Sequence, residues 1–165
     1  ISTGIKRGQA DESIIRRTID LMKQLNKTAS EIAGNYPVNA CTDVTGFGLL
    51  GHLLEMLKAS KVSAEIYHLR VPVIPGTIKL VQLGLLPGGT KNNRKFYSRW
   101  LRWKDTVPET HKYILCDAQT SGGLLLTIPE RHSRKFHQDL LDNGIEYASI
   151  IGHIVQDPSS RITIL

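Results

Sequence analysis

Two aspartates in this chain stand where an apolar run meets a glycine-containing turn, a common position for a carboxylate that holds a cation. Asp43 ends the run that begins at Pro37 and precedes Thr45, Gly46 and Gly48. An ionised carboxylate suits Mg²⁺, which usually takes one or two protein carboxylates and completes its shell with water and phosphate. The two glycines would let backbone amides approach an anion at the start of the next helix. The alternative is that Asp43 or Thr45 only caps that helix, and the spacing alone leaves both interpretations open.

Asp117 begins a second segment of the same kind. It ends the apolar run from Tyr113, which is interpreted as a short strand, and it precedes hydroxyl side chains and two adjacent glycines. The hydroxyls could bond a phosphate, and the glycines would permit tight packing against another backbone. A plain turn is an equal alternative. The candidate residues of this segment are Asp117, Thr120, Ser121, Gly122 and Gly123.

A third glycine-containing segment, Gly88-Gly89-Thr90, admits the same two interpretations. It closes a stretch rich in proline and glycine, residues 69–90, which is expected to be mostly loop around one short helix at 77–83. Loops of this composition often line binding sites.

Basic and aromatic residues interleave from Lys91 to Lys104, a composition found in proteins that bind single-stranded nucleic acid. Phe96, Trp100 and Trp103 are spaced i, i+4 and i+7, so on a helix they would share one face and pack into the core. We therefore favour a helix with a solvated basic face, and nucleic acid is not an expected partner. The solvated residues would be Arg94, Arg99 and Arg102.

The spacing of the remaining polar residues gives little support for a metal cluster or for nucleophilic catalysis. His52 and Glu55 would share one face of the helix that follows Gly48, but a single His-x-x-Glu pair is too common to predict a metal site. No Ser/His/Asp or Cys/His constellation can be read, so no catalytic residue is predicted in this chain. Cys41 and Cys116 lack zinc-type spacing and are expected to be buried free thiols.

Composition is that of a soluble globular domain. The chain has 165 residues, 41% hydrophobic and 22% charged, with a formal charge of +6 and a pI of about 9.4. The net positive charge suits a polyanionic partner such as a nucleotide phosphate. It bears more on how such a partner is attracted to the protein than on what the protein does. No apolar run is long enough to predict a membrane span, and no signal peptide is apparent, so a cytoplasmic protein is expected.

The elements that must position these residues follow from periodicity and turn signals. Strands and helices mix without strict alternation, and the two C-terminal strands can pair antiparallel. This predicts an α+β domain with a mixed, largely antiparallel sheet covered by helices. The expected helices are a long one between Asp11 and Gly34, one carrying Leu50, Leu53, Leu54 and Leu57, and one at 130–143; the expected strands are 37–43, 61–67, 124–128, 145–155 and 161–165.

Three segments in the same order resemble the signature of the selenophosphate synthetase (selenide, water dikinase) family. Residues 40–52, Ala-Cys-Thr-Asp-Val-Thr-Gly-Phe-Gly-Leu-Leu-Gly-His, carry the most specific match, because other members of the wider aminoimidazole ribonucleotide synthetase-like superfamily differ after the shared Asp-x-Thr. Residues 86–90 resemble the family's Pro-Gly-Gly-Thr loop. Residues 116–125 resemble its Asp-Pro-Gln-Thr-Ser-Gly-Gly motif, with Ala118 in place of proline.

The resemblance covers only the C-terminal domain of such enzymes. It implies that residues 1–8 end the segment joining two domains, that residues 9–165 form a single C-terminal domain, and that an N-terminal ATP-binding domain with the catalytic Cys or selenocysteine and a Lys is absent here. The implied reaction converts ATP, selenide and water to selenophosphate, AMP and phosphate with Mg²⁺, and Asp43 would be the metal ligand of this domain. The implied partners are the enzyme's own N-terminal domain and a second copy in a homodimer, and this chain alone is expected to be inactive.

Asn93 is a further candidate from the same resemblance. The family usually reads Gly-Gly-Thr-x-Arg-Asn, and here Asn92 stands in place of the arginine while Asn93 keeps the asparagine.

Two alternatives to a selenophosphate synthetase domain are considered. They are a domain of another ATP-dependent enzyme of the superfamily and a basic RNA-binding module.

Overall fold

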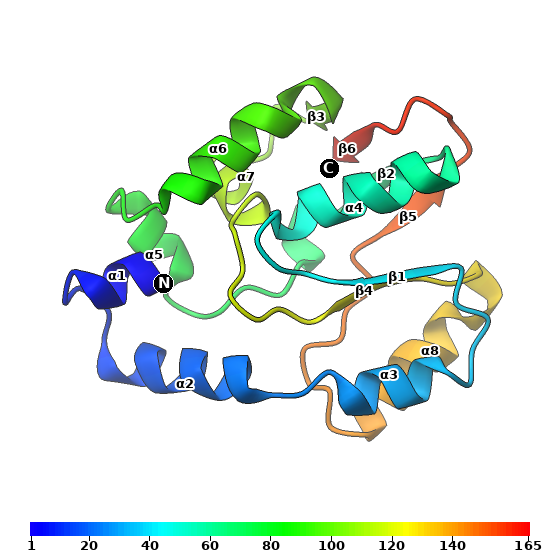
Figure 1. Ribbon diagram of the computed structural model, residues 1–165, viewed down its shortest axis with the longest axis horizontal. Coiled ribbons are helices and arrows are strands. Elements are labelled where there is room, and N and C mark those ends of the chain that lie inside the picture. Colours follow the sequence, from blue (N-terminus) through cyan, green and yellow to red (C-terminus); the bar gives the residue numbers. More distant parts are fainter.

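The computed structural model describes residues 1–165 as six strands, eight α-helices and two short 3₁₀ helices (Figure 1). The N-terminal part is helical, and strands alternate irregularly with helices after residue 40. The elements in chain order are α1 (Ser2–Lys6), α2 (Glu12–Lys23), α3 (Lys27–Ala33), β1 (Ala40–Asp43), α4 (Gly48–Ser60), β2 (Ser63–Ile66), η1 (His68–Arg70), α5 (Thr77–Gln82), α6 (Gly88–Tyr97), η2 (Ser98–Trp100), β3 (Leu101–Trp103), α7 (Glu109–Leu115), β4 (Leu124–Thr127), α8 (Glu130–Asp142), β5 (Gly152–Val155) and β6 (Ile162–Ile164).

The strands form two sheets. β1 pairs antiparallel with β4, which places Asp43 opposite Leu124. The other sheet has the order β3-β6-β2-β5, in which β2 is antiparallel to β5 and parallel to β6, while β3 is parallel to β6. The predicted α+β class with mixed strand directions is confirmed. The predicted single, largely antiparallel sheet is not, because there are two sheets and the larger has two parallel pairs and one antiparallel pair.

The expected pairing of the two C-terminal strands is wrong, because β2 lies between β5 and β6. The turn joining them is anchored at the start of β2. The Ser63 hydroxyl donates to Asp157 at 3.1 Å and accepts from the Arg161 amide at 2.9 Å. The two strands therefore pass on either side of β2 instead of meeting.

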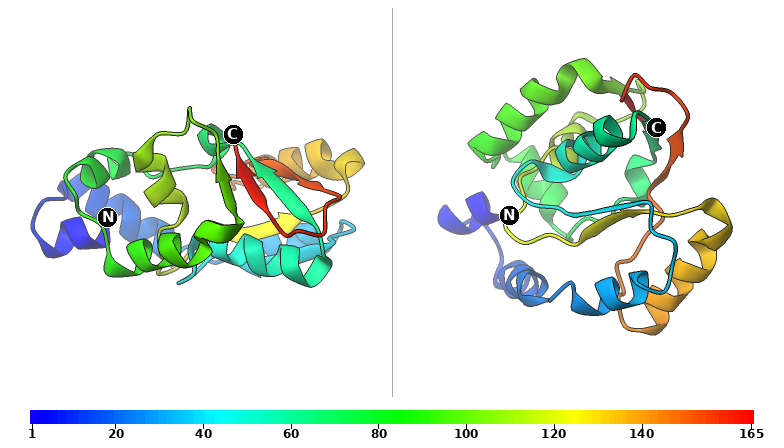
Figure 2. Two further views of the ribbon diagram at one scale, coloured as in Figure 1. Left: turned by 90° about the horizontal axis from the view of Figure 1, so that it is seen from above. Right: turned by 45° about the vertical axis from the view of Figure 1, so that its right-hand side comes forward.

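The main hydrophobic core lies under α4. The four leucines predicted to share one face of this helix, Leu50, Leu53, Leu54 and Leu57, are each at most 2% exposed and pack with Ile162 and Ile164 of β6. A smaller core joins α3 and α8 through Ala33, Phe136 and Leu140. Figures 1 and 2 show α4 on one side of the β1–β4 ribbon and α3 and α8 on the other. The ribbon that carries Asp43 is thus held between two cores.

The predicted long helix between Asp11 and Gly34 is two helices, α2 and α3. The break falls at residues 24–26, where Leu25 is 80% exposed instead of packing on the apolar stripe. Asn26 turns its side chain away from the helix and donates to the carbonyl of Gly122 at 3.1 Å. This tertiary bond competes with helix continuation.

The basic and aromatic segment is not one helix. α6 ends at Tyr97, and Trp103 lies in β3, which pairs with β6. Phe96 is 67% exposed, whereas its neighbour Tyr97 is buried against Gly51 of α4. The predicted shared face of Phe96, Trp100 and Trp103 is therefore wrong, since strand pairing overrides the helical spacing.

Three shorter predictions also need correction. Residues 113–115 end α7, with Cys116 at its C-cap, and form no strand, so Asp117 follows a helix. Gly88, Gly89 and Thr90 are the first turn of α6 and not loop, with Pro87 at the N-cap. The long strand at 145–155 is limited to β5. No helix is long and apolar enough to cross a membrane.

Candidate functional site

The segments that follow β1 and α7 are joined by backbone hydrogen bonds. The amide of Val44 donates to the carbonyl of Gly123 at 3.0 Å, and the amide of Gln119 donates to the carbonyl of Thr45 at 3.0 Å. The first bond continues the β1–β4 register one residue beyond Asp43, and the second joins the loop after β1 to the turn after α7. The first two predicted segments therefore form one unit in space, although more than 70 residues separate them in the chain.

Glycine is required at two points where these backbones touch. A Cβ atom on Gly122 would overlap the carbonyl oxygen of Val44. Gly48 has a φ of +71°, and a Cβ there would lie 2.7 Å from the carbonyl oxygen of Asp117. Gly122 has the tight packing predicted for it, whereas Gly123, for which the same was predicted, has open space. Gly48, predicted to let amides approach an anion, is buried and packs against another backbone.

Asn93 joins α6 to both segments. Its side-chain amide donates to the carbonyl of Gly46 at 3.0 Å and to the carbonyl of Cys116 at 3.2 Å. Gly89, on the same helix, lies beside Ala118, because a Cβ added to Gly89 would be 3.6 Å from the Cβ of Ala118. All three glycine-containing segments thus meet at the end of β1. A contact between Asn93 and phosphate stays a prediction.

Thr90 and Asp117 bond to each other. Thr90 is fully buried and donates its hydroxyl to the carboxylate of Asp117. Burial raises the pKa of Asp117, and this effect is opposed by the hydrogen bonds from Thr90 and Gln119. The observed arrangement anchors the second segment on α6, while phosphate contacts by Thr90 and Asp117 stay predictions.

Asp43 stands apart from this network. Its side chain is exposed, and no hydrogen bond or ion pair of the structure involves its carboxylate. The cap position of α4 is Phe47, with no side-chain cap hydrogen bond, so neither Asp43 nor Thr45 caps the helix in the expected alternative way. The carboxylate is free to accept a cation.

The surface beside Asp43 is polar and backbone-rich. Thr120 and Ser121 are exposed, and their hydroxyls form no hydrogen bond within the chain. The exposed glycines of the three segments leave backbone groups accessible. These glycines are Gly46, Gly88, Gly89 and Gly123.

The residues of this site supply only part of a Mg²⁺ ligand set. No group of three or more His, Cys, Asp or Glu side chains is placed to hold a metal ion. One free carboxylate at an exposed strand end suits a hard cation that takes its remaining ligands from water and phosphate. Asp43 fits as one ligand and does not make a complete site.

The two cysteines differ, contrary to the expectation that both are buried. Cys116 is fully buried, and burial raises the pKa of its thiol to about 12. Cys41 is free and exposed, two residues before Asp43 on the same face of β1. Burial of part of the side chain and then the Asp43 carboxylate raise the pKa of Cys41.

Two residues of this region carried no clear signal in the sequence. Asn26, which donates to Gly122, lay inside the predicted long helix, where an asparagine is a weak sign of a break. His52 bonds the hydroxyl of Thr45 at 3.2 Å, and only the His-x-x-Glu spacing drew attention to it.

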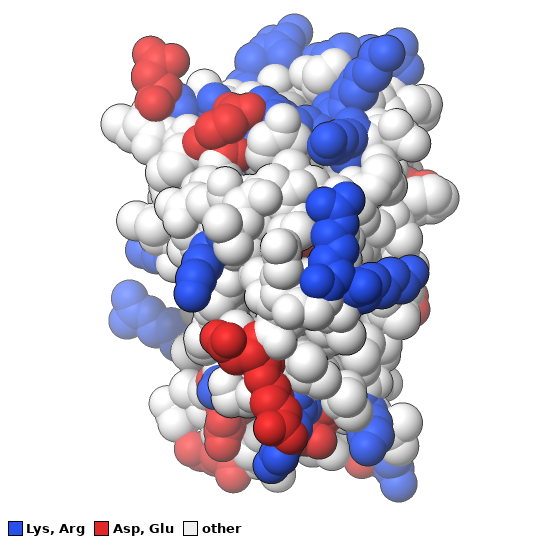
Figure 3. All heavy atoms as spheres, turned by 90° about the vertical axis from the view of Figure 1, so that its left-hand side faces the viewer, with Lys and Arg blue, Asp and Glu red and all other residues white.

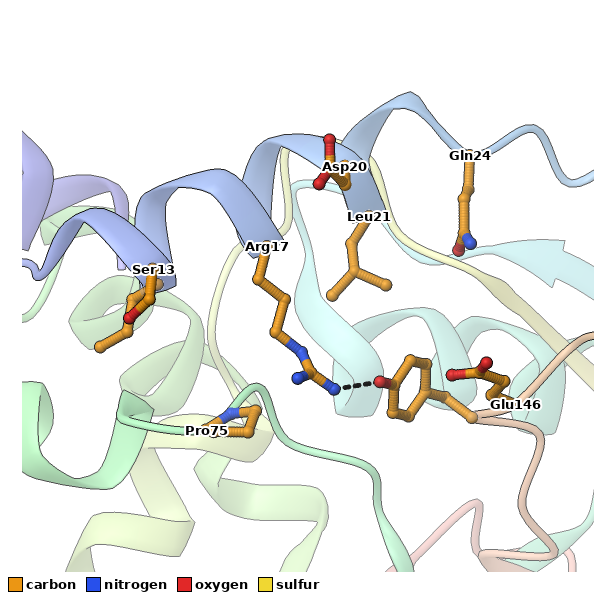
Figure 4. Close-up of a pocket in the computed structure, with 9 residues that line it drawn as sticks. Ser13, Arg17, Asp20, Leu21, Gln24, Pro75 and Glu146 are labelled. Atoms are coloured by element: carbon orange, nitrogen blue, oxygen red, sulfur yellow. Dashed lines mark hydrogen bonds between the residues drawn. The ribbon is translucent and has the colours of Figure 1, made fainter.

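A cavity lies away from this site, between α2 and the segment that contains Glu146 and Tyr147 (Figure 4). It has a volume of about 440 Å³. Arg17 of α2 points across it and donates a hydrogen bond to the hydroxyl of Tyr147. None of the predicted site residues lines this cavity.

Charge on one face of the molecule is mixed. Figure 3 shows the side that lies at the left of Figure 1, where basic side chains are interrupted by acidic ones and by uncharged surface. This face has no continuous basic stripe of the kind that tracks a nucleic-acid backbone.

Comparison with known proteins gives one family match and several relatives. Residues 3–165 match the family described as AIR synthase related protein, C-terminal domain. A selenide, water dikinase of Clostridioides difficile (strain 630) is 39% identical over 165 residues, which are 100% of this chain and 47% of that protein. A selenide, water dikinase of Myxococcus xanthus (strain DK1622) is 41% identical over 155 residues, 93% of this chain and 44% of that protein. One of Pelobacter propionicus is 38% identical over 164 residues, 99% of this chain and 47% of that protein. The chain therefore spans about half the length of the curated relatives it matches.

Proposed function

The chain belongs to the AIR synthase related family as one of its C-terminal domains, and from this premise we propose that it is the C-terminal part of a selenide, water dikinase. The proposed reaction of the whole enzyme takes ATP, selenide and water to selenophosphate, AMP and phosphate. The proposal is supported by relatives of that name at 38–41% identity. The observation that carries it is the meeting of three glycine-containing segments at the end of β1, beside the free carboxylate of Asp43.

A second domain is part of the proposal, because this chain accounts for only about half of its relatives. We expect the N-terminal domain to supply the ATP pocket and the catalytic Cys or selenocysteine and Lys. The first eight residues are expected to end the segment between the domains. In the structure, residues 2–6 form α1, and Gly4 packs against Leu80 of α5.

Asp43 is proposed to be the residue of this domain that holds Mg²⁺. A bound Mg²⁺ would neutralise charge on the nucleotide phosphates during phosphoryl transfer. The backbone of the adjacent loop fixes where the carboxylate stands. Val44 is bonded to Gly123 and Thr45 to Gln119, so the segment after α7 holds the end of the strand that carries the carboxylate at two points. Such rigidity reduces the reorganisation needed when a charged ligand binds.

The exposed polar groups beside Asp43 are proposed to face the substrate phosphates. Thr120 and Ser121 have hydroxyls without partners in the chain, and Gly46 is exposed, with no other atom within 4 Å of the position that a Cβ would take. Asn93, Thr90 and Gly122 support this surface from behind through the bonds and close contacts described above. Their substitution is expected to act through the shape of the site.

The experiment that tests the function is phosphorus NMR of the full-length enzyme with ATP, Mg²⁺ and selenide. The parent is expected to form selenophosphate, and Asp43→Ala is expected to lose it while remaining folded. Asp105→Ala is the matched control, because Asp105 is an exposed carboxylate in the turn after β3 that joins no ion pair.

The outcomes separate the hypotheses. Equal selenophosphate from the parent and Asp43→Ala would retain the enzyme class and remove the cation role of Asp43. Phosphate release that does not depend on selenide would favour another ATP-dependent enzyme of the superfamily. Residues 1–165 alone are expected to turn over no ATP, and selenide-dependent hydrolysis by them would contradict the proposed division between domains.

A homodimer and a cytoplasmic location are further parts of the proposal, both carried by the family resemblance. An RNA-binding role gains no support from the aromatic segment. Lys58 and Arg99 each place their charged group 3.8 Å from the centre of the Trp100 ring, so this ring is already covered by cations and not open for base stacking.

A further inference from the structure

His52 is a buried polar side chain on a helix whose other buried side chains are leucines. His52 is 8% exposed and lies one turn after the start of α4. A buried imidazole is costly unless its nitrogens find partners. Its position in the structure therefore calls for an explanation beyond filling space.

Both ring nitrogens of His52 face polar groups. Nε2 lies 3.2 Å from the hydroxyl of Thr45, which is two residues after Asp43. Nδ1 lies 3.9 Å from the carboxylate of Glu55, one turn further along α4. The ring of Phe47 packs on the imidazole with centroids 5.3 Å apart. His52 thus connects the solvent-facing Glu55 to the loop that follows Asp43.

The hydrogen bond between His52 and Thr45 restrains the loop whichever group donates. With the proton on Nδ1, toward Glu55, Nε2 accepts from the Thr45 hydroxyl; with a proton on Nε2, the ring donates to the hydroxyl oxygen. In both cases the bond restrains the rotamer of Thr45, and the bond from the Gln119 amide holds its carbonyl.

Thr45 is consequently held at two atoms, one by each of the elements that flank it. Its carbonyl is tied to the segment after α7 and its hydroxyl to α4. Because α4 has no side-chain cap, the bond to His52 is the side-chain hydrogen bond by which this helix holds the loop. Loss of that bond would remove the restraint that α4 places on this loop and leave only those from Asn93 and from the segment after α7.

We propose that His52 is a positioning residue, which orients the loop after β1 through the hydroxyl of Thr45 and so sets the direction of the Asp43 carboxylate. The proposal deepens the proposed function and rests on it for the role of Asp43. The hydrogen-bonded geometry of His52, Thr45 and Glu55 stands independently of the reaction.

The first measurement is hydrogen exchange by mass spectrometry on the full-length protein, which needs no activity. Thr45→Val and His52→Leu keep the side-chain volume but remove the bond, and each should speed exchange in residues 43–50 by about three- to tenfold. Thr45→Ser and His52→Gln keep a partner and should exchange as the parent does. The double variant should exchange no faster than either single variant, since both remove the same bond.

The second measurement separates positioning from structural damage. In the active enzyme, the Mg²⁺ concentration for half-maximal selenophosphate formation should rise in Thr45→Val and His52→Leu and recover in Thr45→Ser. A parent without selenophosphate activity would overturn the proposed function while leaving the exchange test intact.

Three results would overturn the positioning role. They are unchanged exchange at 43–50 in both single variants, an equal rise at the control segments 63–66 and 162–164, and additive effects in the double variant. An unaltered Mg²⁺ requirement in a variant whose loop exchanges faster would also reject it.

Discussion

Replacing Gly48 by alanine tests whether the loop after β1 and the segment after α7 must touch. Gly48 has a φ of +71°, which costs a non-glycine residue about 1 kcal/mol. The added Cβ would lie 2.7 Å from the carbonyl oxygen of Asp117 and 2.9 Å from that of Cys116, so one backbone must shift. Overpacking of this kind costs roughly 1–3 kcal/mol. Together the two effects predict a loss of about 3 kcal/mol in the free energy of unfolding.

The assay is thermal unfolding of this chain, with Gly46→Ala as the matched control. Gly46 is in the same loop, has no positive φ, and a Cβ added to it would have no other atom within 4 Å. A loss of about 3 kcal/mol corresponds to a fall of roughly 6–12 °C in Tm for a domain of this size. Gly46→Ala should change Tm by at most a few degrees. Equal Tm values for the two variants would refute the claim that close backbone contact makes glycine necessary at position 48.

The remaining predictions concern the same region. Gly122→Ala should destabilise the fold by about 2 kcal/mol or more, whereas Gly123→Ala, which has open space, should be neutral or slightly stabilising; equal effects in denaturant unfolding would contradict this. Asp43→Asn should lower the pKa of Cys41 by removing one of its two causes, so thiol labelling at fixed pH should become faster, and an unchanged rate would count against the charge coupling. The pKa of Asp117 is raised above 3.8 by burial, so the stability tied to its protonation is present at acid pH and lost as pH rises through the folded pKa. Asp117→Asn should therefore gain stability over the parent toward neutral pH, and a difference independent of pH would show that titration is not its origin.

The predicted elements succeed where burial and local periodicity agree. The helix with Leu50, Leu53, Leu54 and Leu57 is present as predicted, because its apolar stripe faces a single core. The strands at 63–66 and 162–164 and the helix α8 also fall inside their predicted ranges. In each of these elements, the local hydrophobic pattern and the packing against neighbouring elements favour the same structure.

The predicted elements fail where a contact distant in sequence overrides the local pattern. The spacing of Phe96, Trp100 and Trp103 is helical, yet Trp103 is drawn into β3 by pairing with β6. The long N-terminal helix breaks where Asn26 bonds Gly122, nearly 100 residues away. The local hydrophobic periodicity gives no information about partners so distant in the sequence.

At the candidate site, the sequence identified the residues, but it did not show which of them face solvent and which join the segments. Asp43 was predicted to be either a cation ligand or a helix cap at a strand end, and the structure leaves it exposed and unbonded. Thr90, Asp117 and Asn93 were identified together with the exposed residues, but they turn inward and join the segments. Their direction depends on which backbone carbonyls and side chains lie opposite.

The sequence by itself determined the family, the α+β class and the three glycine-containing segments proposed to form the site, because these depend on residue types, short spacings and local apolar patterns. Only the tertiary structure decided that the three segments meet, that Gly48 and Gly122 are needed for backbone contact, and that His52 holds Thr45. The reason is physical: hydrogen bonds and close contacts between residues far apart in the chain form only once the two cores hold the β1–β4 ribbon in place.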